Sequence, residues 1–263
     1  MRIGLITPAP DHPLLAATTA LLAPDHAVEV LNPDTVRSVS DRPHADVYLL
    51  KSRTPHALAL ARELERRGAR MVNSAAATAR VQDRTEMADM ARQAGLPFAP
   101  TRTFAALSEL AGLADPVVVK SRHSYKGDLV ARVDSHVQLR ELAERHPQEP
   151  VVVQEFAPNS GWDHKLWAVG DQVFAALRRS ELAPGEQGET RPLAPADLPS
   201  GWADLVRRVG EVFALDVYGV DVIGTGGDAD ARVPLIVDIN AFPGIRNQPG
   251  APEALAALAL VRP

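Results

Sequence analysis

The sequence predicts an α/β domain with a parallel sheet at the N-terminal end, followed by α+β domains with antiparallel sheets. In residues 1–75, apolar strand-like runs alternate with helix-like segments, an order typical of a parallel sheet. In the last part of the chain, apolar runs instead face each other across polar turns, which is typical of antiparallel hairpins. We therefore expect three domains, at residues 1–75, 76–150 and 151–263.

The N-terminal domain is expected to alternate between strands and helices. The strands are residues 2–7, 28–31, 46–50 and 70–73, and the helices are residues 14–22 and 55–67. Gly68 ends the second helix, because glycine readily adopts the left-handed conformation there. Polar residues follow two strands, at Thr7–Pro10 and Lys51–Arg53, where open parallel sheets bind ligands. No GxGxxG pattern follows the first strand, which argues against a dinucleotide site.

The remaining chain is expected to be α+β. The strands are residues 117–120, 151–156, 165–169 and 172–178, and the helices are residues 84–94, 135–145, 202–215 and 252–260. Gly170 and Asp171 join two of these strands in a hairpin. Residues 96–104 are expected to form an extended link, because prolines interrupt them. Residues 181–200 lack periodicity and are rich in Pro and Gly, so we expect a long loop.

The composition excludes several classes of protein. The chain is 46% hydrophobic and 23% charged, and its net charge of −5 lacks the basic surplus that nucleic acids and anionic membranes attract. Without cysteine there is no disulfide, Cys-based zinc site or thiol catalysis, and a reducing compartment fits. The first apolar run is broken by Pro8, unlike a signal peptide, and no run is long enough to span a membrane. We therefore expect a cytoplasmic location.

The strongest functional signal lies in residues 218–244, where two apolar runs flank a Gly/Asp-rich loop and predict a β-hairpin. Asp221 lies in the first run, and strand alternation puts Asp238 and Asn240 on one face of the second. Ionised carboxylates among Val and Ile need a compensating charge, and hard oxygen donors suit Mg²⁺ that bridges to phosphates. A half-exposed sheet with Asp on its wet face is the alternative.

Lysine is rare in this chain, at four of the 28 basic residues, and each one therefore deserves a functional hypothesis. Lys120 ends the apolar run VVVK, and the loop after it contains Ser124, Lys126 and Gly127. A loop of small residues can present backbone N–H groups to phosphates while lysine adds charge. The alternative is a strand that ends in solvent.

The next strand ends in Gln154, Glu155 and Phe156. Backbone groups at a strand end can bind an adenine edge while an aromatic ring packs beside the base. Asp163 shares a strand face with Lys165 and could accept hydrogen bonds from ribose hydroxyls. The alternatives are a strand that simply runs into a loop and an exposed charge pair.

The order of these pieces resembles the ATP-grasp superfamily, in particular its ribosomal S6 modification protein-like and lysine-biosynthesis ligase branch. The matching runs are VVVK, the small-residue loop, QEF, DHK, a strand that ends in RR, GVDVI and VDINAFPG. The resemblance covers residues 70–250 and implies ATP-grasp domains after the N-terminal domain, with ATP and Mg²⁺ as cofactors. Only one residue of the RR pair can face such a site, because strand neighbours point to opposite faces.

The resemblance also implies a role for each matching residue. ATP would be bound by Arg84, Lys120, Ser124, Lys126, Gly127, Gln154, Glu155, Phe156 and Asp163. Magnesium would be bound by Asp221, Asp238 and Asn240, and Arg179 would be catalytic by steadying the charge on an acyl phosphate. By their position, Lys51, Arg53 and Arg246 are expected to bind a substrate carboxylate.

The chain departs from the family pattern at several positions. Arg84 replaces a usual Lys, Asp238 a usual Glu and Lys165 a common Arg. Residues 181–200 also lack the Arg-Ser/Thr-Asn pattern of the ligase branch.

We expect an ATP-dependent carboxylate–amine ligase that forms an amide or peptide bond through an acyl phosphate. Its partners would be a small-molecule carboxylate and an amine, either an amino acid or a peptide. Two alternatives stay open: a kinase of the same superfamily that phosphorylates a hydroxyl, as inositol phosphate kinases do, and a non-catalytic nucleotide-binding protein. The oligomeric state is also open, with a homo-oligomer as one alternative.

Overall fold

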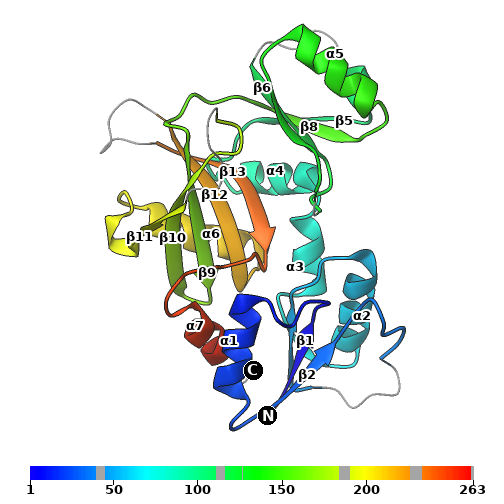
Figure 1. Ribbon diagram of the computed structural model, residues 1–263, viewed down its shortest axis with the longest axis vertical. Coiled ribbons are helices and arrows are strands. Elements are labelled where there is room, and N and C mark those ends of the chain that lie inside the picture. Colours follow the sequence, from blue (N-terminus) through cyan, green and yellow to red (C-terminus); the bar gives the residue numbers. More distant parts are fainter. Residues whose placement is uncertain (40–44, 111–115, 126, 184–189, 226–232, 262–263) are drawn as a thin grey trace.

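The computed structural model describes all residues except 40–44, 111–115, 126, 184–189, 226–232 and 262–263. Its described part contains a parallel sheet followed by two antiparallel sheets, which confirms the predicted fold class (Figure 1).

The N-terminal sheet is parallel and has the strand order β2-β1-β3-β4. Its elements are β1 (Arg2–Ile6), α1 (Pro13–Leu22), β2 (Ala27–Leu31), β3 (Val47–Leu50), α2 (Pro55–Arg66) and β4 (Arg70–Val72). Helix α2 begins where expected, because the hydroxyl of Thr54 accepts a hydrogen bond from the backbone N–H of Ala57 and Pro55 occupies the first turn. This sheet brings the segment after β1 and the segment after β3 to the same edge.

The second sheet is small and antiparallel, with the order β5-β8-β6-β7. Its elements are β5 (Thr101–Phe104), η1 (Leu107–Glu109), β6 (Val117–Ser121), β7 (Val130–Val133), α5 (His136–Arg145) and β8 (Val151–Glu155). Leu139 and Leu142 of α5 pack against one face of this sheet in a separate core. Two helices precede the sheet, α3 (Ala75–Arg80) and α4 (Arg84–Gln93).

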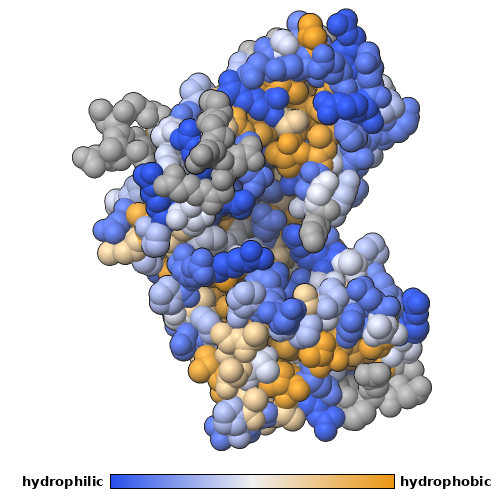
Figure 2. All heavy atoms as spheres, in the orientation of Figure 1, coloured by the Kyte–Doolittle hydropathy of each residue, from blue (hydrophilic) through white to orange (hydrophobic). Residues whose placement is uncertain are grey.

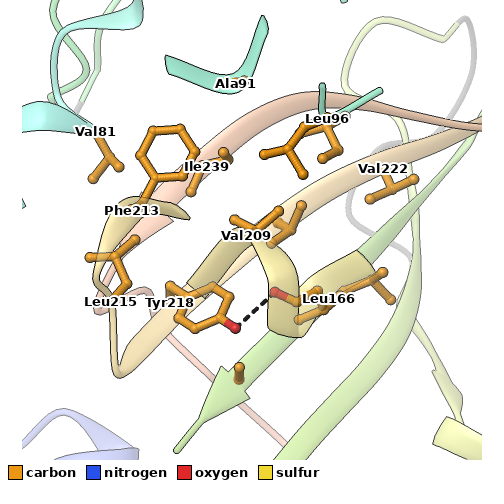
Figure 3. Close-up of a cluster of buried hydrophobic side chains, with 14 of the residues drawn as sticks. Val81, Ala91, Leu96, Leu166, Val209, Phe213, Leu215, Tyr218, Val222 and Ile239 are labelled. Carbon is orange, nitrogen blue, oxygen red and sulfur yellow. Dashed lines mark hydrogen bonds between the residues drawn. The ribbon is translucent and has the colours of Figure 1, made fainter. Parts of the chain in front are cut away.

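The third sheet is the largest and has the order β11-β10-β9-β12-β13. Its elements are β9 (Trp162–Val169), β10 (Gln172–Arg179), β11 (Thr190–Leu193), η2 (Pro195–Asp197), α6 (Trp202–Phe213), β12 (Val217–Thr225), β13 (Val233–Ala241) and α7 (Ala251–Leu260). Helix α6 packs on one face, and the hydroxyl of Tyr218 donates to the backbone carbonyl of Val206 across 2.8 Å within that core (Figure 3). Part of the opposite face packs against α1 and α7, and other residues of the sheet line cavities.

An irregularity between β12 and β13 decides which side chains reach those cavities. Asp221 pairs with Asp238, but the next residue, Val222, pairs with Ile236, so Val237 is an extra residue in β13. Such a β-bulge rotates the strand locally and changes the direction of its side chains. Ile236 therefore remains in the core, while Val237 and Asp238 both line the same cavity.

The parallel sheet is tied to the largest sheet by Asn73, which directly follows β4. Its fully buried amide donates to the carbonyl of Val217 at 2.7 Å. The amide oxygen accepts from the backbone N–H groups of Asp216 and Val217, at 2.7 and 2.8 Å. Helices α1 and α7 also pack together, so both ends of the chain meet beside this junction (Figure 1).

Most predicted elements occur as expected, with three corrections. The link predicted at residues 96–104 contains β5, because Thr101–Phe104 pairs with β8. The loop predicted at residues 181–200 contains β11, although residues 184–189 lie outside the described part. Helix α3 was not predicted. The strand β8 joins the small sheet although it begins beyond residue 150, and the domain boundaries themselves stay a prediction.

Among the described residues, no helix combines the length and apolar character needed to cross a membrane.

We predict that Asn73→Ala lowers the free energy of unfolding by about 3 kcal/mol, because three hydrogen bonds are lost and their buried partners stay unpaired. Urea denaturation followed by circular dichroism measures this change. The matched control is Asn32→Ala, which removes one exposed hydrogen bond to the N–H of Asp34. We expect less than ~1 kcal/mol for the control, and equal effects of both changes would contradict the role given to Asn73.

Candidate functional site

A cavity of about 320 Å³ lies between the small sheet and the largest sheet. Eleven predicted site residues line it: Arg53, Arg84, Lys120, Ser124, Gln154, Glu155, Phe156, Asp163, Asp221, Asp238 and Asn240. Figure 2 shows the surface hollowed between the upper part of the molecule, which holds the small sheet, and the lower part, which holds the parallel sheet. Residues from 53 to 240 in the sequence thus meet in one place.

The two carboxylates of the predicted metal site face each other across the bulged hairpin. Asp221 and Asp238 are direct register partners in β12 and β13, and Asn240 lies two residues further along β13. All three line the cavity, as the alternation of β13 predicts. The Asn240 amide oxygen accepts a hydrogen bond from Arg53 at 3.3 Å, which fixes the orientation of this amide.

Arg84, the first residue of α4, lies against the carboxylate of Asp238. Its guanidinium contacts Asp238 at 3.0 Å and Asp128 at 2.5 Å, and it donates to the Ser121 carbonyl at 2.9 Å. The Arg84 side chain is only 6% exposed, so these contacts are poorly screened by water. Burial by itself would raise the pKa of Asp238, but Arg84 and Lys120 outweigh burial and hold that pKa below its usual value.

The β-bulge also explains the position of Lys120. Because Val237 has no register partner in β12, its carbonyl is available, and the ammonium of Lys120 donates to it at 2.7 Å. Lys120 is buried, and burial lowers its pKa to about 8 despite the nearby carboxylates. An incoming phosphate would favour the protonated form of this lysine and raise its pKa again.

A second ion network lies on β9. The Lys165 ammonium is 2.9 Å from Asp221 and 3.5 Å from Asp163. Burial lowers the pKa of Lys165, but the two carboxylates reverse this effect and raise the pKa overall. The side chains of Lys165 and Asp163 are only 17% and 16% exposed, so the alternative of an exposed charge pair is wrong.

A further part of the cavity lies at the end of β8 and includes apolar side chains. Gln154 is buried, and its amide donates to the Thr101 hydroxyl at 3.1 Å. The backbone N–H of Phe156 donates to the Pro116 carbonyl at 3.1 Å, and the Arg132 guanidinium lies over the Phe156 ring at 3.8 Å. A planar base would find apolar walls here, beside a strand end.

The loop after Lys120 is placed only in part at the cavity. Ser124 is buried and lines the cavity. Gly127 is exposed and has a φ of 83°, which is the left-handed conformation that glycine adopts without strain, but it does not line the cavity. Lys126 lies outside the described residues, so its predicted role stays a prediction.

A second cavity of about 490 Å³ lies on the other side of the hairpin carboxylates. Its lining includes Trp167, Pro243 and Arg246, and none of its described lining residues belongs to the small sheet. The two cavities share four lining residues: Lys165, Arg178, Asp221 and Asn240. This shared wall is where groups bound in the two cavities would meet.

The three residues expected to bind a substrate carboxylate surround the end of β13. Arg53 lines the first cavity, and Arg246 lines the second. The Lys51 ammonium donates to the Phe242 carbonyl at 2.8 Å. Burial, together with the charges of Arg53 and Arg246, lowers the pKa of Lys51 to about 8. This crowding of like charges favours a bound anion.

The structure brings Arg178, and not the predicted Arg179, to the two cavities. Arg178 lines both cavities, whereas Arg179 lies with its guanidinium 5.8 Å from the Trp162 ring and lines neither. The register explains this placement, because Arg178 pairs with Asp163 and therefore shares the cavity face. Asp128 was not predicted, and Lys165 was placed on the same strand face as Asp163 but was given no role at the site.

The residues present fit a magnesium ion bound together with phosphates. Asp221, Asp238 and Asn240 supply hard oxygen donors from two paired strands, and Mg²⁺ commonly takes its remaining ligands from water and phosphate. No group of three or more His, Cys, Asp or Glu side chains suited to a metal occurs in the described part of the chain.

Known proteins resemble this chain in sequence. The family described as the RimK-like ATP-grasp domain matches residues 93–251. A probable alpha-L-glutamate ligase from Picosynechococcus sp. is 27% identical over 212 residues, which cover 74% of this chain and 66% of the relative. A ribosomal protein bS6–L-glutamate ligase from Shigella flexneri is 23% identical over 251 residues, which cover 84% of this chain and 80% of the relative.

Solved structures share the fold. A RimK domain ATP-grasp protein from Sphaerobacter thermophilus has a TM-score of 0.75 at 22% identity, covering 99% of this chain and 100% of that one. A D-alanine–D-alanine ligase from Bacillus anthracis, complexed with ATP, has a TM-score of 0.70 at 15% identity, covering 93% of this chain and 87% of that one. At these identities, the structural likeness concerns the fold alone.

We predict that affinity for ADP falls as the pH rises through 8, because an incoming phosphate prefers protonated Lys120, whose pKa is about 8. The fall approaches about tenfold per pH unit once Lys120 is mostly neutral. Calorimetric titration from pH 7 to 9.5 measures it. Lys120→Arg keeps its charge over this range and should remove the pH dependence. An unchanged pH profile in this variant would contradict the assignment of Lys120 to the phosphates.

Proposed function

The chain belongs to the RimK-like ATP-grasp family and is an ATP-dependent ligase that forms carbon–nitrogen bonds; on that premise we propose which residues carry the reaction. The observation that supports the proposal most directly is the wall shared by the two cavities. ATP binds in the first cavity and the carboxylate in the second, and the phosphoryl group passes between them at Lys165, Arg178, Asp221 and Asn240.

In the first cavity, the base lies between the two sheets at Gln154, Glu155 and Phe156, and Asp163 faces the ribose. Lys120 and Arg84 lie on the phosphate side, beside Ser124. Mg²⁺ held by Asp221, Asp238 and Asn240 would neutralise charge on the transferred phosphoryl group. The residues themselves position and desolvate the phosphates, and such electrostatic positioning accounts for most catalysis of phosphoryl transfer.

The reaction then has two balanced steps. A carboxylate oxygen attacks the γ-phosphorus of ATP, the bond from that phosphorus to the bridging oxygen breaks, and ADP leaves. The amine nitrogen attacks the carbonyl carbon of the acyl phosphate and expels phosphate, and the nitrogen loses a proton as the amide forms. Arg178, rather than the predicted Arg179, lies where it can stabilise the charge on the acyl phosphate.

The substrates proposed are a small-molecule carboxylate and an amine, either an amino acid or a peptide. Two relatives are named glutamate ligases, so glutamate is the first amino acid to test. Lys51, Arg53 and Arg246 surround the end of β13 and suit an additional carboxylate on either substrate. A cytoplasmic location is part of this proposal, and a homo-oligomer stays a prediction.

Trapping with hydroxylamine tests the proposal. The protein is incubated with Mg-ATP, hydroxylamine and a panel of amino acids, short peptides and polyols, and both ADP and hydroxamate are measured. Hydroxamate with one carboxylate is the expected result, because hydroxylamine intercepts an acyl phosphate. ADP release with a polyol and without hydroxamate would instead identify a kinase. Failure to bind ATP at all would overturn the assignment of the first cavity.

We predict that Asp238→Ala lowers kcat by at least about 100-fold, because it removes a metal ligand and the partner of Arg84. Steady-state ADP release at saturating Mg-ATP measures this change. Asp89→Ala is the matched control, since Asp89 pairs with Arg92 on the exposed side of α4. Normal turnover of the Asp238 variant would refute the metal site.

We also predict that Lys51→Met raises the KM for the carboxylate or amino acid substrate about tenfold and leaves the KM for ATP within about twofold. The reason is that Lys51 belongs to the cation group at the end of β13 and does not line the ATP cavity. Varying each substrate in turn separates the two constants. A rise confined to the KM for ATP is the result that would remove Lys51 from the substrate site.

A further inference from the structure

We propose that Asp128 is a positioning residue for the ligase reaction, which holds the guanidinium of Arg84 at the phosphate end of the first cavity once Asp238 binds Mg²⁺. This inference rests on the proposed function. Asp128 lies between β6 and β7 of the small sheet, whereas Asp238 belongs to the largest sheet, so Arg84 bridges the two sides of the cavity.

The geometry gives Arg84 two carboxylate partners of different kinds. Asp238 contacts one terminal nitrogen at 3.0 Å, and Asp128 contacts the other at 2.5 Å. Both Asp side chains are only 13% exposed and both line the cavity. The planar fork of a guanidinium can hold two carboxylates at once in this way, which the single ammonium of lysine does less well.

Only one of these partners is also a proposed metal ligand. When Asp238 turns to a divalent cation, Arg84 shares that carboxylate with a second positive charge, and the two cations repel each other. A buried guanidinium without a counter-charge is strongly disfavoured, so Arg84 would be driven from the cavity unless another carboxylate held it. Asp128 supplies that carboxylate, and it leaves the other guanidinium edge directed toward the phosphates.

The small sheet makes this role specific to the position of Asp128. The Arg84 guanidinium also donates to the Ser121 carbonyl, at the end of the strand that carries Lys120. Asp128 and Ser121 thus fix Arg84 to the same β6–β7 connection that contributes Ser124 to the cavity wall. Arg84, Lys120 and this connection would then reach the phosphates together.

A purely structural ion pair would behave differently, and the metal distinguishes the two roles. Without Mg²⁺, Asp238 still holds Arg84, so loss of the Asp128 charge should change the Kd of ADP only slightly. With Mg²⁺, Asp128 is the remaining counter-charge of Arg84, so its loss should raise the Kd of Mg-ADP the most. Adenosine has no phosphates, so loss of the Asp128 charge should leave its Kd unchanged with or without Mg²⁺. A structural role would instead weaken all three ligands alike.

The test is calorimetric titration of the full chain with Mg-ADP, with ADP in EDTA and with adenosine. The variants are Asp128→Asn, Asp128→Glu and the control Asp89→Asn, which alters an exposed Asp–Arg pair on α4. We expect Asp128→Asn to raise the Kd of Mg-ADP about tenfold, equivalent to ~1.4 kcal/mol, and the other two Kd values less than about twofold. Asp128→Glu keeps the charge and should recover part of the Mg-ADP affinity.

Several outcomes would overturn the proposal. These are an unchanged Kd for Mg-ADP in Asp128→Asn, equal weakening of all three ligands, and loss of the folded state in both Asp128 variants, which would assign a structural role. Failure of the unaltered chain to bind Mg-ADP would be a failure of the proposed function itself. The thermal midpoint of each variant is measured first so that these results can be separated.

Discussion

The structure depends on one electrostatic constraint, the placement of Asp221 opposite Asp238 in a largely buried hairpin. Like charges at directly paired positions of two strands repel each other, and burial removes the water that would screen them. Two cations compensate this repulsion. Lys165 lies beside Asp221, and Arg84 lies beside Asp238. In the proposed function, Mg²⁺ and the phosphates enter a network that is already balanced, so binding exchanges partners and does not create an isolated charge.

Several parts of the fold bring charged or polar groups to this pair of carboxylates. The bulge at Val237 turns Asp238 into the cavity and frees the carbonyl that Lys120 binds. Helix α4 begins with Arg84 beside the Asp238 carboxylate. Arg53, in the segment after β3, donates a hydrogen bond to the Asn240 amide oxygen. The segment after β3, the small sheet and the largest sheet therefore each contribute at least one charged group to the first cavity. The buried Asn73 holds the parallel sheet and the largest sheet together. Loss of register between the sheets would separate charges that compensate each other.

Much of this was accessible from the sequence, for identifiable reasons. Strand alternation placed Asp238 and Asn240 on one face, and the scarcity of lysine pointed to Lys120. The arginine pair was different, because alternation shows that only one residue faces the cavity but does not say which, and Arg178 follows only from its register with Asp163. Asp128 was not predicted, since nothing local distinguishes it and its partner is 44 residues away. Strands β5 and β11 were missed because they are short and lie in proline-containing segments whose pairing is set by tertiary contacts.

The central claim is that a carboxylate from the second cavity takes the γ-phosphoryl group at the shared wall. Oxygen transfer tests it most directly. The carboxylate that gives a hydroxamate is labelled with ¹⁸O at its reacting carboxyl group, and the phosphate formed with Mg-ATP and the amine is analysed by mass spectrometry. An acyl phosphate requires one carboxylate oxygen to leave with phosphate, so the account predicts phosphate that carries a single ¹⁸O. Unlabelled phosphate formed together with the amide would contradict it.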